Sequence, residues 1–595
     1  MTRSGRPDPL LPDYVAGDFA LTDPPECDMI MKGGVTSGIV YPYAVLEIAT
    51  RYRFRSLGGT SAGAIAAAFA AAAEYGRREG RPESFLVLKS YCDQLPTILL
   101  SLFQPDPSLR PATQSVKRVM EAGGVRPLVT AALAGGVPLA FLGAALFGTI
   151  SWLAQPSLYP TALAAALGGF IGEALGVYRW LRSTIADPLI AAIRQLPDKD
   201  FGFCTGLTQP GQDAPALTDW IHAALQHIAF GDPNHPRPLT FGDLACPEDP
   251  SRAINLQVVT TNLSMRRPHT LPRLGAAAGF MPESWARLFP EPVMAYLKSE
   301  GSRPWRRFAG AWLFPREEAL PVVVAVRMSL SFPVLFTSVP LKIEDTELPS
   351  IVKSLGGKPY KRIRTAHFSD GGISSNFPIH MFDAPLPSRP TFAFALEELL
   401  WNPEEVTGRV ALPATASEGM GVQIKELKTV QDFAWQILNS AKDWQDQLTS
   451  EITGQRERIA RIFLSRSEGG LNLAMSAETS RQLMAWGYEA GSRFKNGDFS
   501  FDEHRWRRLL VLYRHLDENL AAVERVWDEG FGDWYEAYAP LVKSYKRLTL
   551  RDRAHIADTM RALMAAQQGG APEAIADAQD KLPRKVGVLK VAPRF

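Results

Sequence analysis

A serine in the segment Gly59-Thr60-Ser61-Ala62-Gly63 has the surroundings of a nucleophile. Tyr52–Leu57 before it predicts a strand, and the alanine-rich Ala64–Tyr75 after it predicts a helix. Small residues between a strand and a helix allow a sharp turn that exposes the serine oxygen and directs helix N–H groups at a developing oxyanion. A G-x-S-x-G string alone can arise by chance, so the flanking elements carry the prediction. We expect Ser61 to be the nucleophile that attacks a carbonyl, and the Ala62 amide to donate a hydrogen bond to the oxyanion that forms.

Such a serine needs a base, and the tetrahedral intermediate needs hydrogen-bond donors. The loop Gly33–Gly38 follows a predicted strand, Cys27–Lys32, so its amides can converge on an oxyanion. A plain tight turn is the alternative; a P-loop is excluded because no Gly-Lys-Ser/Thr follows. Asp370, followed by two glycines after a predicted strand, is the candidate base, although such a carboxylate can also simply cap a turn.

The nine histidines are poorer candidates for the catalytic base than Asp370. His504, His515 and His555 lie in charge-dense helical stretches, where we expect solvated surface residues. His367 and His380 flank the segment that contains Asp370.

Three segments, taken in order, resemble the patatin-like phospholipase family: KGGVTSGIVYP, GGTSAGAIAAA and SDGGISSNFPI. The resemblance implies a Ser61–Asp370 dyad without histidine, on a three-layer α/β/α core with a mostly parallel sheet. It also implies an acyl pocket shaped by Arg327–Val339. It makes Gly33 and Gly34 oxyanion donors and places the remaining motif glycines at Gly38, Gly59, Gly63, Gly371 and Gly372. Val35 and Ser37 depart from the family, which has a third glycine and a basic residue there.

The composition is that of a globular protein, with 46% hydrophobic and 21% charged residues. A net charge of +2 argues against nucleic acid as a partner. Four scattered cysteines predict free thiols in a reducing compartment. No spacing resembles a zinc or calcium site, so we expect neither metal nor cofactor. Without an apolar run near the N-terminus, we expect no secretory signal and a cytoplasmic catalytic core.

The chain divides into five predicted regions. Three of them frame the core: an N-terminal extension (1–26) and the two core halves (27–104 and 251–400). An insertion (105–250) separates the halves, and a helical C-terminal region (401–595) ends in a basic tail, Lys581–Phe595. Ile254–Thr261 and Pro321–Val326 are rich in β-branched residues, which is typical of buried strands, and the apolar pattern continues to Thr391–Leu396.

The insertion contains no charged residue or histidine from Pro127 to Gly172. Leu128–Leu153 and Thr161–Val177 predict two helices joined by a turn, each long enough to cross a membrane. Basic residues flank only the outer ends (Lys117, Arg118 and Arg126 before, Arg179 and Arg182 after), which favours a hairpin with both ends in the cytoplasm. The alternatives are a lid of buried helices and an element that docks on lipid without crossing it.

These features together predict an acyl-ester hydrolase of the phospholipase A or lysophospholipase type, acting on phospholipid or lysophospholipid at a membrane. One alternative is a thioesterase or acyltransferase with the same dyad. The other is a membrane-anchored interaction protein with a vestigial catalytic centre. Protein partners are not predicted.

Overall fold

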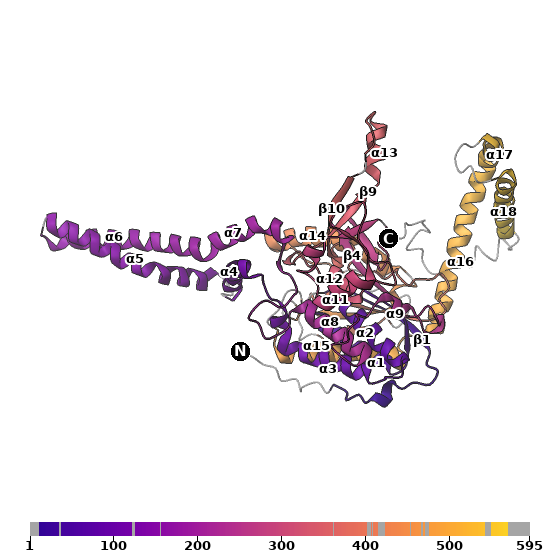
Figure 1. The fold of residues 1–595 in the computed structure, drawn as a ribbon, viewed down its shortest axis with the longest axis horizontal. Helices are drawn as coiled ribbons and strands as arrows, with labels where there is room; N and C mark the ends of the chain where they lie inside the picture. The colour runs from indigo at the N-terminus through magenta and orange to yellow at the C-terminus, as the bar shows by residue number, and fades with distance from the viewer. Residues whose placement is uncertain are drawn as a thin grey trace.

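The computed structural model describes residues 11–34, 37–121, 125–154, 156–275, 277–360, 362–401, 406, 408–413, 423–452, 454–465, 468–469, 475–541 and 549–568. Within these residues the protein is a mixed α/β structure built on an 11-stranded sheet. A helical C-terminal region follows the sheet (Figure 1). The basic tail predicted at Lys581–Phe595 lies outside the described residues.

The strands of the large sheet are arranged in the order β12-β13-β11-β1-β2-β4-β10-β9-β6-β7, with β5 also paired to β4. A separate two-stranded sheet joins β3 and β8. The bounds are β1 Glu26–Met31, β2 Arg53–Gly59, β3 Gly202–Cys204, β4 Asn255–Asn262, β5 Arg267–Leu271, β6 Ala278–Phe280, β7 Trp312–Leu313, β8 Val334–Phe336, β9 Val339–Asp345, β10 Arg362–Asp370, β11 Thr391–Glu398, β12 Val410–Ala411 and β13 Ile459–Leu464.

Only the centre of this sheet is parallel. Strands β13, β11, β1, β2 and β4 run in one direction. The pairings of β4 with β5 and β10, and those of the outer strands, are antiparallel. The expectation of a mostly parallel sheet therefore holds for the centre alone.

The helices comprise α1 Tyr41–Ala49, α2 Ala62–Arg78, α3 Ser84–Ile98, α4 Arg110–Glu121, α5 Val125–Ala154, α6 Leu158–Leu181, α7 Asp187–Gln195, α8 Leu217–Phe230, α9 Phe241–Ala245, α10 Pro282–Trp285, α11 Glu291–Tyr296, α12 Val322–Ser329, α13 Glu347–Ser354, α14 Val430–Glu451, α15 Ala477–Asn496, α16 Phe501–Val526, α17 Gly532–Tyr538 and α18 Leu550–Gln568.

The structure corrects three expectations from the sequence, which concern α12, the C-terminal region and His504. The run Pro321–Val326 is not a strand: Val322–Ser329 forms α12, which Pro321 precedes as N-cap. Every residue of α12 is buried, and burial against neighbouring elements outweighs the β propensity of its valines. The C-terminal region is not only helical, because it supplies β12 and β13 to the sheet. His504 is buried beside Glu457 rather than solvated.

The main core lies on the face of the sheet that α1, α2, α3 and α15 cover. Alternate strand residues such as Met29, Leu57 and Phe392 point into it, and the Phe392 ring packs 4.6 Å from that of Phe494 in α15. The opposite face buries a smaller cluster, in which Ile30 packs with Phe377 and Ile379 from the segment after β10. The loop that follows Asp370 thus covers the second face of the sheet centre.

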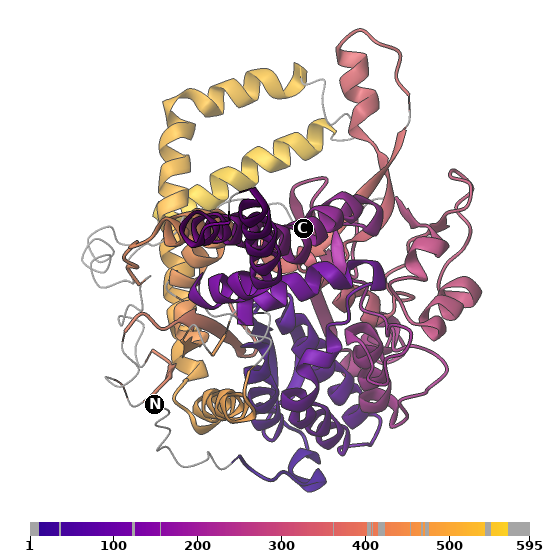
Figure 2. The ribbon, with the colours of Figure 1, turned by 90° about the vertical axis from the view of Figure 1, so that its left-hand side faces the viewer.

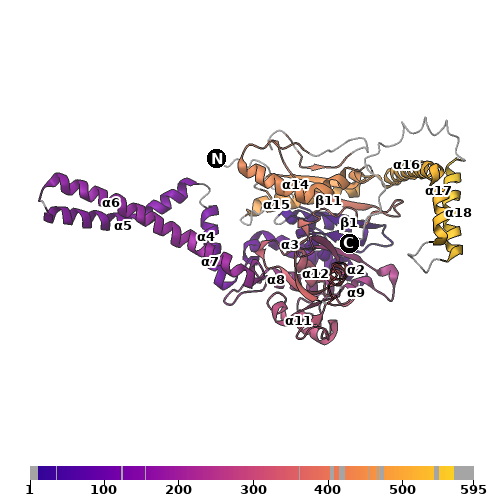
Figure 3. The ribbon, with the colours of Figure 1, turned by 90° about the horizontal axis from the view of Figure 1, so that it is seen from above.

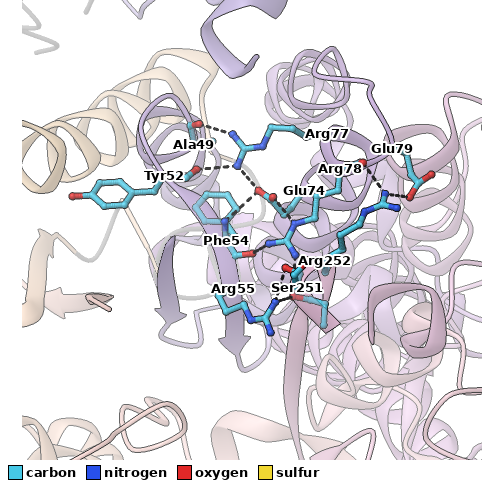
Figure 4. A network of polar contacts seen from close by, with 11 residues as sticks. Ala49, Tyr52, Phe54, Arg55, Glu74, Arg77, Arg78, Glu79, Ser251 and Arg252 are labelled. Carbon is cyan, nitrogen blue, oxygen red and sulfur yellow. Dashed lines mark hydrogen bonds and ion pairs between the residues drawn. The ribbon is translucent and has the colours of Figure 1, made fainter. Parts of the chain in front are cut away.

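A buried ion-pair network locks the C-terminal end of α2 to the start of β2 (Figure 4). The carboxylate of Glu74 accepts the Phe54 amide at 3.2 Å and pairs with Arg77 and with Arg78, the latter at 2.8 Å. Arg78 also donates to the Phe54 carbonyl at 2.5 Å. Because a buried charge is tolerated only when it is paired and hydrogen-bonded, this network fixes α2 against β2. The network lies at the opposite end of the β2–α2 unit from the turn that contains Ser61.

Two long helical elements project from opposite sides of the body (Figures 1 and 3). One is the hairpin of α5 and α6, which α4 and α7 join to the body; Figure 2 looks along it. The other is formed by α16, α17 and α18. By length and composition alone, the two hairpin helices are able to cross a membrane, and only 11% and 17% of their apolar windows are buried.

Candidate active site

Ser61 sits at the turn between β2 and α2, as its sequence context predicts. It is the N-cap of α2 and has φ 53° and ψ −128°, a region that residues other than glycine rarely occupy. Its amide donates to the buried hydroxyl of Ser329 at 2.9 Å, which helps to hold the strained backbone. The serine side chain is therefore fixed at the N-terminus of a 17-residue helix, the favourable end for a developing negative charge.

The motif glycines are required by close backbone contacts. A Cβ on Gly59 would lie 2.3 Å from the Gly63 carbonyl oxygen, and one on Gly63 would lie 2.4 Å from that of Met31. A Cβ on Gly38 would meet that of Ala62 at 2.4 Å, and one on Gly371 would lie 2.2 Å from the Val259 oxygen. The first two motif segments are thus packed against each other and Gly371 against β4, so larger residues would displace them.

Asp370 is the last residue of β10 and is buried next to Ser61. Burial raises its pKa to about 6, and the nearby Ser61 hydroxyl and the Gly372 amide, which favour the ionised form, limit that rise. The Gly372 amide donates to Oδ1 at 2.7 Å. The other oxygen, Oδ2, is buried and has no hydrogen-bond partner among the described residues. It is therefore free to receive a proton from the serine.

The two histidines nearest in sequence lie elsewhere. His367 places Nδ1 2.9 Å from the Ser338 hydroxyl, and burial lowers its pKa. His380 is exposed to solvent. Among the described residues, the pKa of the Asp370 carboxyl is lowered by Ser61, Gly372 and Lys442, and none of these groups is a histidine. The described residues also contain no group of three or more His, Cys, Asp or Glu side chains placed to hold a metal ion.

The three expected oxyanion donors are not equivalent. The Gly33 amide already donates to the Asn376 carbonyl at 2.8 Å, so it supports the loop rather than pointing to a free site. The amides of Gly34 and Ala62 have no acceptor among the described residues, which leaves them available. Val35 and Thr36, the next two residues of this loop, lie outside the described part of the chain.

An apolar cavity of about 90 Å³ opens at Ser61. Its wall is formed by Gly38, Ala62, Ile65, Phe69 and Trp220, by Leu88, Leu95 and Leu102, and by Leu330, Phe332 and Phe336 from the segment that we expected to shape an acyl pocket. The far end reaches Phe103, where the Phe103 and Phe336 rings pack 5.4 Å apart. The apolar wall suits the hydrocarbon part of an ester whose carbonyl lies at Ser61.

A second cavity, of about 530 Å³, lies on the other side of Asn376 and is polar. Its basic side chains are Lys32, Arg409, Lys425 and Arg461. Each is paired with an acid: Lys32 with Glu397 at 3.2 Å, Lys425 with Glu398 at 2.5 Å, and the two arginines with Glu468 and Glu397. The basic side chains of this lining are therefore each engaged by an acid.

Three residues around the site were not assigned a role from the sequence. Ser329 and Asn376 lie within segments that the motifs had marked, the first in Arg327–Val339 and the second in SDGGISSNFPI. Asp446 lies in α14, 76 residues after Asp370, and contacts the loop at Ser375–Phe377. Nothing in the helical pattern of α14 distinguishes it from the other acids there. The four cysteines are unpaired, as predicted.

The fold and the site define an α/β protein in which a strained serine and a buried aspartate meet beside an apolar cavity, at the carboxyl end of a parallel sheet centre. The chain is 33% identical to the protein described as RpoH suppressor from Rhizobium meliloti (strain 1021), over 668 residues that cover 97% of this chain and 100% of the relative. It therefore belongs to the family of that protein. No protein-family model matches the chain. Since the relative's name states no reaction, any inference about chemistry rests on the site.

Proposed function

We propose that the protein is a lipid acyl-ester hydrolase of the phospholipase A or lysophospholipase type, with a patatin-like core and a Ser61–Asp370 dyad. One observation carries the proposal: a serine in a strained strand–helix turn lies between a buried carboxylate and an apolar cavity. Each part is also found in proteins without this activity. Together they supply a nucleophile, its base and a place for the acyl chain.

In the proposed reaction the Ser61 oxygen attacks the ester carbonyl while Asp370 Oδ2 accepts the serine proton. The amides of Gly34 and Ala62 donate to the oxyanion, and the N-terminal end of α2 stabilises its charge. The tetrahedral intermediate collapses to an acyl-enzyme when the proton passes from Asp370 to the leaving alcohol. Water then attacks the acyl-enzyme by the same route, with Asp370 as base, and releases the fatty acid.

The position of the cavity supports a lipid substrate. After Phe103, which lines the cavity, the chain leaves the body for the hairpin and returns at β3. The outgoing and returning segments pair where the Asp106 amide donates to the Phe203 carbonyl at 2.8 Å. Phe103 of the cavity wall thus lies three residues before the root of the hairpin, where Asp106 also pairs with Lys199 at 2.9 Å. In this proposal the acyl chain enters the cavity from that side.

The hairpin itself supports a membrane as the place of action, with the catalytic body on the cytoplasmic side. Its large apolar side chains face outward: Phe141 and Phe170 are each 74% exposed, and Leu158 at the tip is 81% exposed. Small residues fill the interface between the helices, where Gly168, Gly172 and Gly176 are buried. That distribution suits lipid outside and close helix packing inside. It does not suit a lid, whose apolar side chains would be buried.

The test is labelling and hydrolysis with the full-length protein. We expect a fluorophosphonate probe to label the wild-type protein at Ser61, and we expect hydrolysis of a short-chain nitrophenyl ester and of lysophosphatidylcholine. Ser61→Ala should lose all three signals while keeping its melting temperature. Loss of a nucleophile costs several orders of magnitude, so residual turnover above roughly 1% would contradict the assignment. Absence of labelling in the folded wild type would favour a vestigial centre.

A further inference from the structure

The C-terminal region reaches the candidate active site through one carboxylate. Asp446, in the last two turns of α14, is buried and accepts three hydrogen bonds from the loop that follows Asp370. The amides of Asn376 and Phe377 donate to Oδ2 at 2.5 and 2.8 Å, and the Ser375 hydroxyl donates to Oδ1 at 3.2 Å. A helix outside the predicted core therefore binds the backbone of the catalytic loop directly.

The same loop also binds the other two motif segments. The Asn376 carbonyl accepts the Gly33 amide at 2.8 Å and the Thr60 hydroxyl at 3.0 Å. Gly33 begins the oxyanion loop, and Thr60 immediately precedes Ser61. A Cβ on Gly33 would lie 2.4 Å from the Asn376 side-chain oxygen, so the fit around this residue is tight. One peptide, at Asn376, thus links Asp446 to the oxyanion loop and the nucleophile turn.

Burying the Asp446 carboxylate to attach α14 to the body costs free energy. Burying a carboxylate disfavours its ionised form, and burial raises the pKa of Asp446 to about 6 despite the three hydrogen bonds. An apolar side chain would attach α14 to the body without that cost. Unlike an apolar side chain, a carboxylate fixes the orientation of the loop peptides, because it accepts short hydrogen bonds from two consecutive amides.

We propose that Asp446 is a positioning residue for the dyad, which makes α14 and the C-terminal region part of the catalytic unit. The proposal rests on the proposed function, in which the Gly33–Gly34 loop and the Ser61 turn must keep a fixed geometry. Asp446 does not touch the reacting atoms. It acts through Asn376 on the segments that do.

Three variants of full-length protein test this. Asp446→Ala removes all three hydrogen bonds, and we expect kcat on a short-chain nitrophenyl ester to fall at least tenfold with KM changed less than threefold. Asp446→Asn keeps an oxygen for the two amides and can donate to Ser375, so it should recover kcat to within about threefold of wild type. Glu451→Ala, the last residue of the same helix, is the matched carboxylate control and should stay within twofold.

Hydrogen exchange gives a readout that does not depend on activity. In Asp446→Ala, peptides that contain Gly33 and Asn376–Phe377 should exchange faster at a temperature well below melting, and in Asp446→Asn they should resemble wild type. If Asp446→Ala keeps wild-type kcat, or if Asn fails as completely as Ala, the positioning role is wrong. If exchange rises as expected but Ser61→Ala retains esterase activity, the proposed function fails instead. If Asp446→Ala does not fold, Asp446→Leu takes its place with the same expected outcomes, because leucine keeps an apolar attachment of α14 but accepts no hydrogen bond from the loop.

Discussion

Ser61 and Asp370 are each held in a state that is costly for the folded chain. Ser61 has a positive φ, and Asp370 is a buried acid with one oxygen that lacks a partner in the described chain. Such costs are typically about 1–3 kcal/mol each and persist only where the surrounding structure imposes them. Here the surroundings are the Ser329 hydroxyl, the Gly372 amide and the packed motif glycines.

The cost at Asp370 can be measured as a pH-dependent stability. Its pKa is about 6 when folded and near the ordinary 3.8 when unfolded, so the folded state binds this proton more tightly. Protonated Asp370 therefore contributes its full stabilisation below pH 4. As the pH rises through 6 this stabilisation is lost, which lowers the free energy of unfolding by at most about 3 kcal/mol. We expect Asp370→Asn to gain stability relative to wild type between pH 4 and pH 8 in thermal melts. A constant difference over that range would show that Asp370 ionises freely.

In the proposed reaction, the pKa of Asp370 also sets the pH dependence of activity. Asp370 must be ionised to accept the serine proton, so kcat/KM should fall below a midpoint near pH 6. Lys442 lowers this pKa by its charge, so Lys442→Met should move the midpoint upward. Lys428→Met removes an exposed lysine near the start of α14 and should leave it unchanged. A midpoint that does not respond to Lys442 would place the titrating group elsewhere.

At the scale of elements, the β2–α2 unit must pack tightly against β1 to place Ser61. Gly63→Ala would push a methyl group to 2.4 Å from the Met31 carbonyl oxygen, so α2 has to shift. Overpacking of this kind costs about 1–3 kcal/mol, and a 1 Å displacement of the nucleophile can cost about a hundredfold in rate. We expect a lower melting temperature and a large loss of kcat/KM. Gly17→Ala, where a Cβ meets nothing within 4 Å, is the control.

The elements predicted well from the sequence are those in which local pattern and tertiary contact agree. Strand β1, strand β2 and helix α2 have the expected types, and Ser61 lies at the expected turn. Helix α12 was predicted wrongly because its valines follow their buried environment rather than their intrinsic preference. Strand β13 and Asp446 could not be predicted, because their roles depend on partners more than 60 residues away, at β11 and at the Asn376 loop. No local signal in β13 or in α14 indicates which distant segment each would contact.

At the scale of the whole molecule, the proposed membrane role of the hairpin is supported by how its two helices pack. The backbones of α5 and α6 are in direct contact along the interface between them, which we call the seam. A Cβ on Gly143 would lie 2.1 Å from the Gly168 oxygen, and one on Gly172 would lie 2.0 Å from the Leu139 oxygen. Glu173, the single acid of the pair of apolar helices, packs against Gly136 inside the seam. In water the outward-facing apolar side chains would form a large exposed patch, which soluble monomers rarely carry.

The hairpin should therefore hold the protein on a membrane, and fractionation tests this directly. We expect full-length protein to pellet with membranes and to resist washing with high salt, because apolar contact with lipid is not screened by ions. Replacing residues 127–177 with a short Gly/Ser linker should release a soluble protein that still hydrolyses a short-chain ester, since Ser61 and Asp370 lie in the body. The same variant should lose activity on phospholipid vesicles, because the root of the hairpin would no longer face a bilayer.

A matched variant with Gly/Ser in place of residues 347–354 (helix α13) should remain in the membrane pellet. If full-length protein stays soluble and monomeric without detergent, the hairpin packs against protein rather than lipid, and the membrane proposal is wrong.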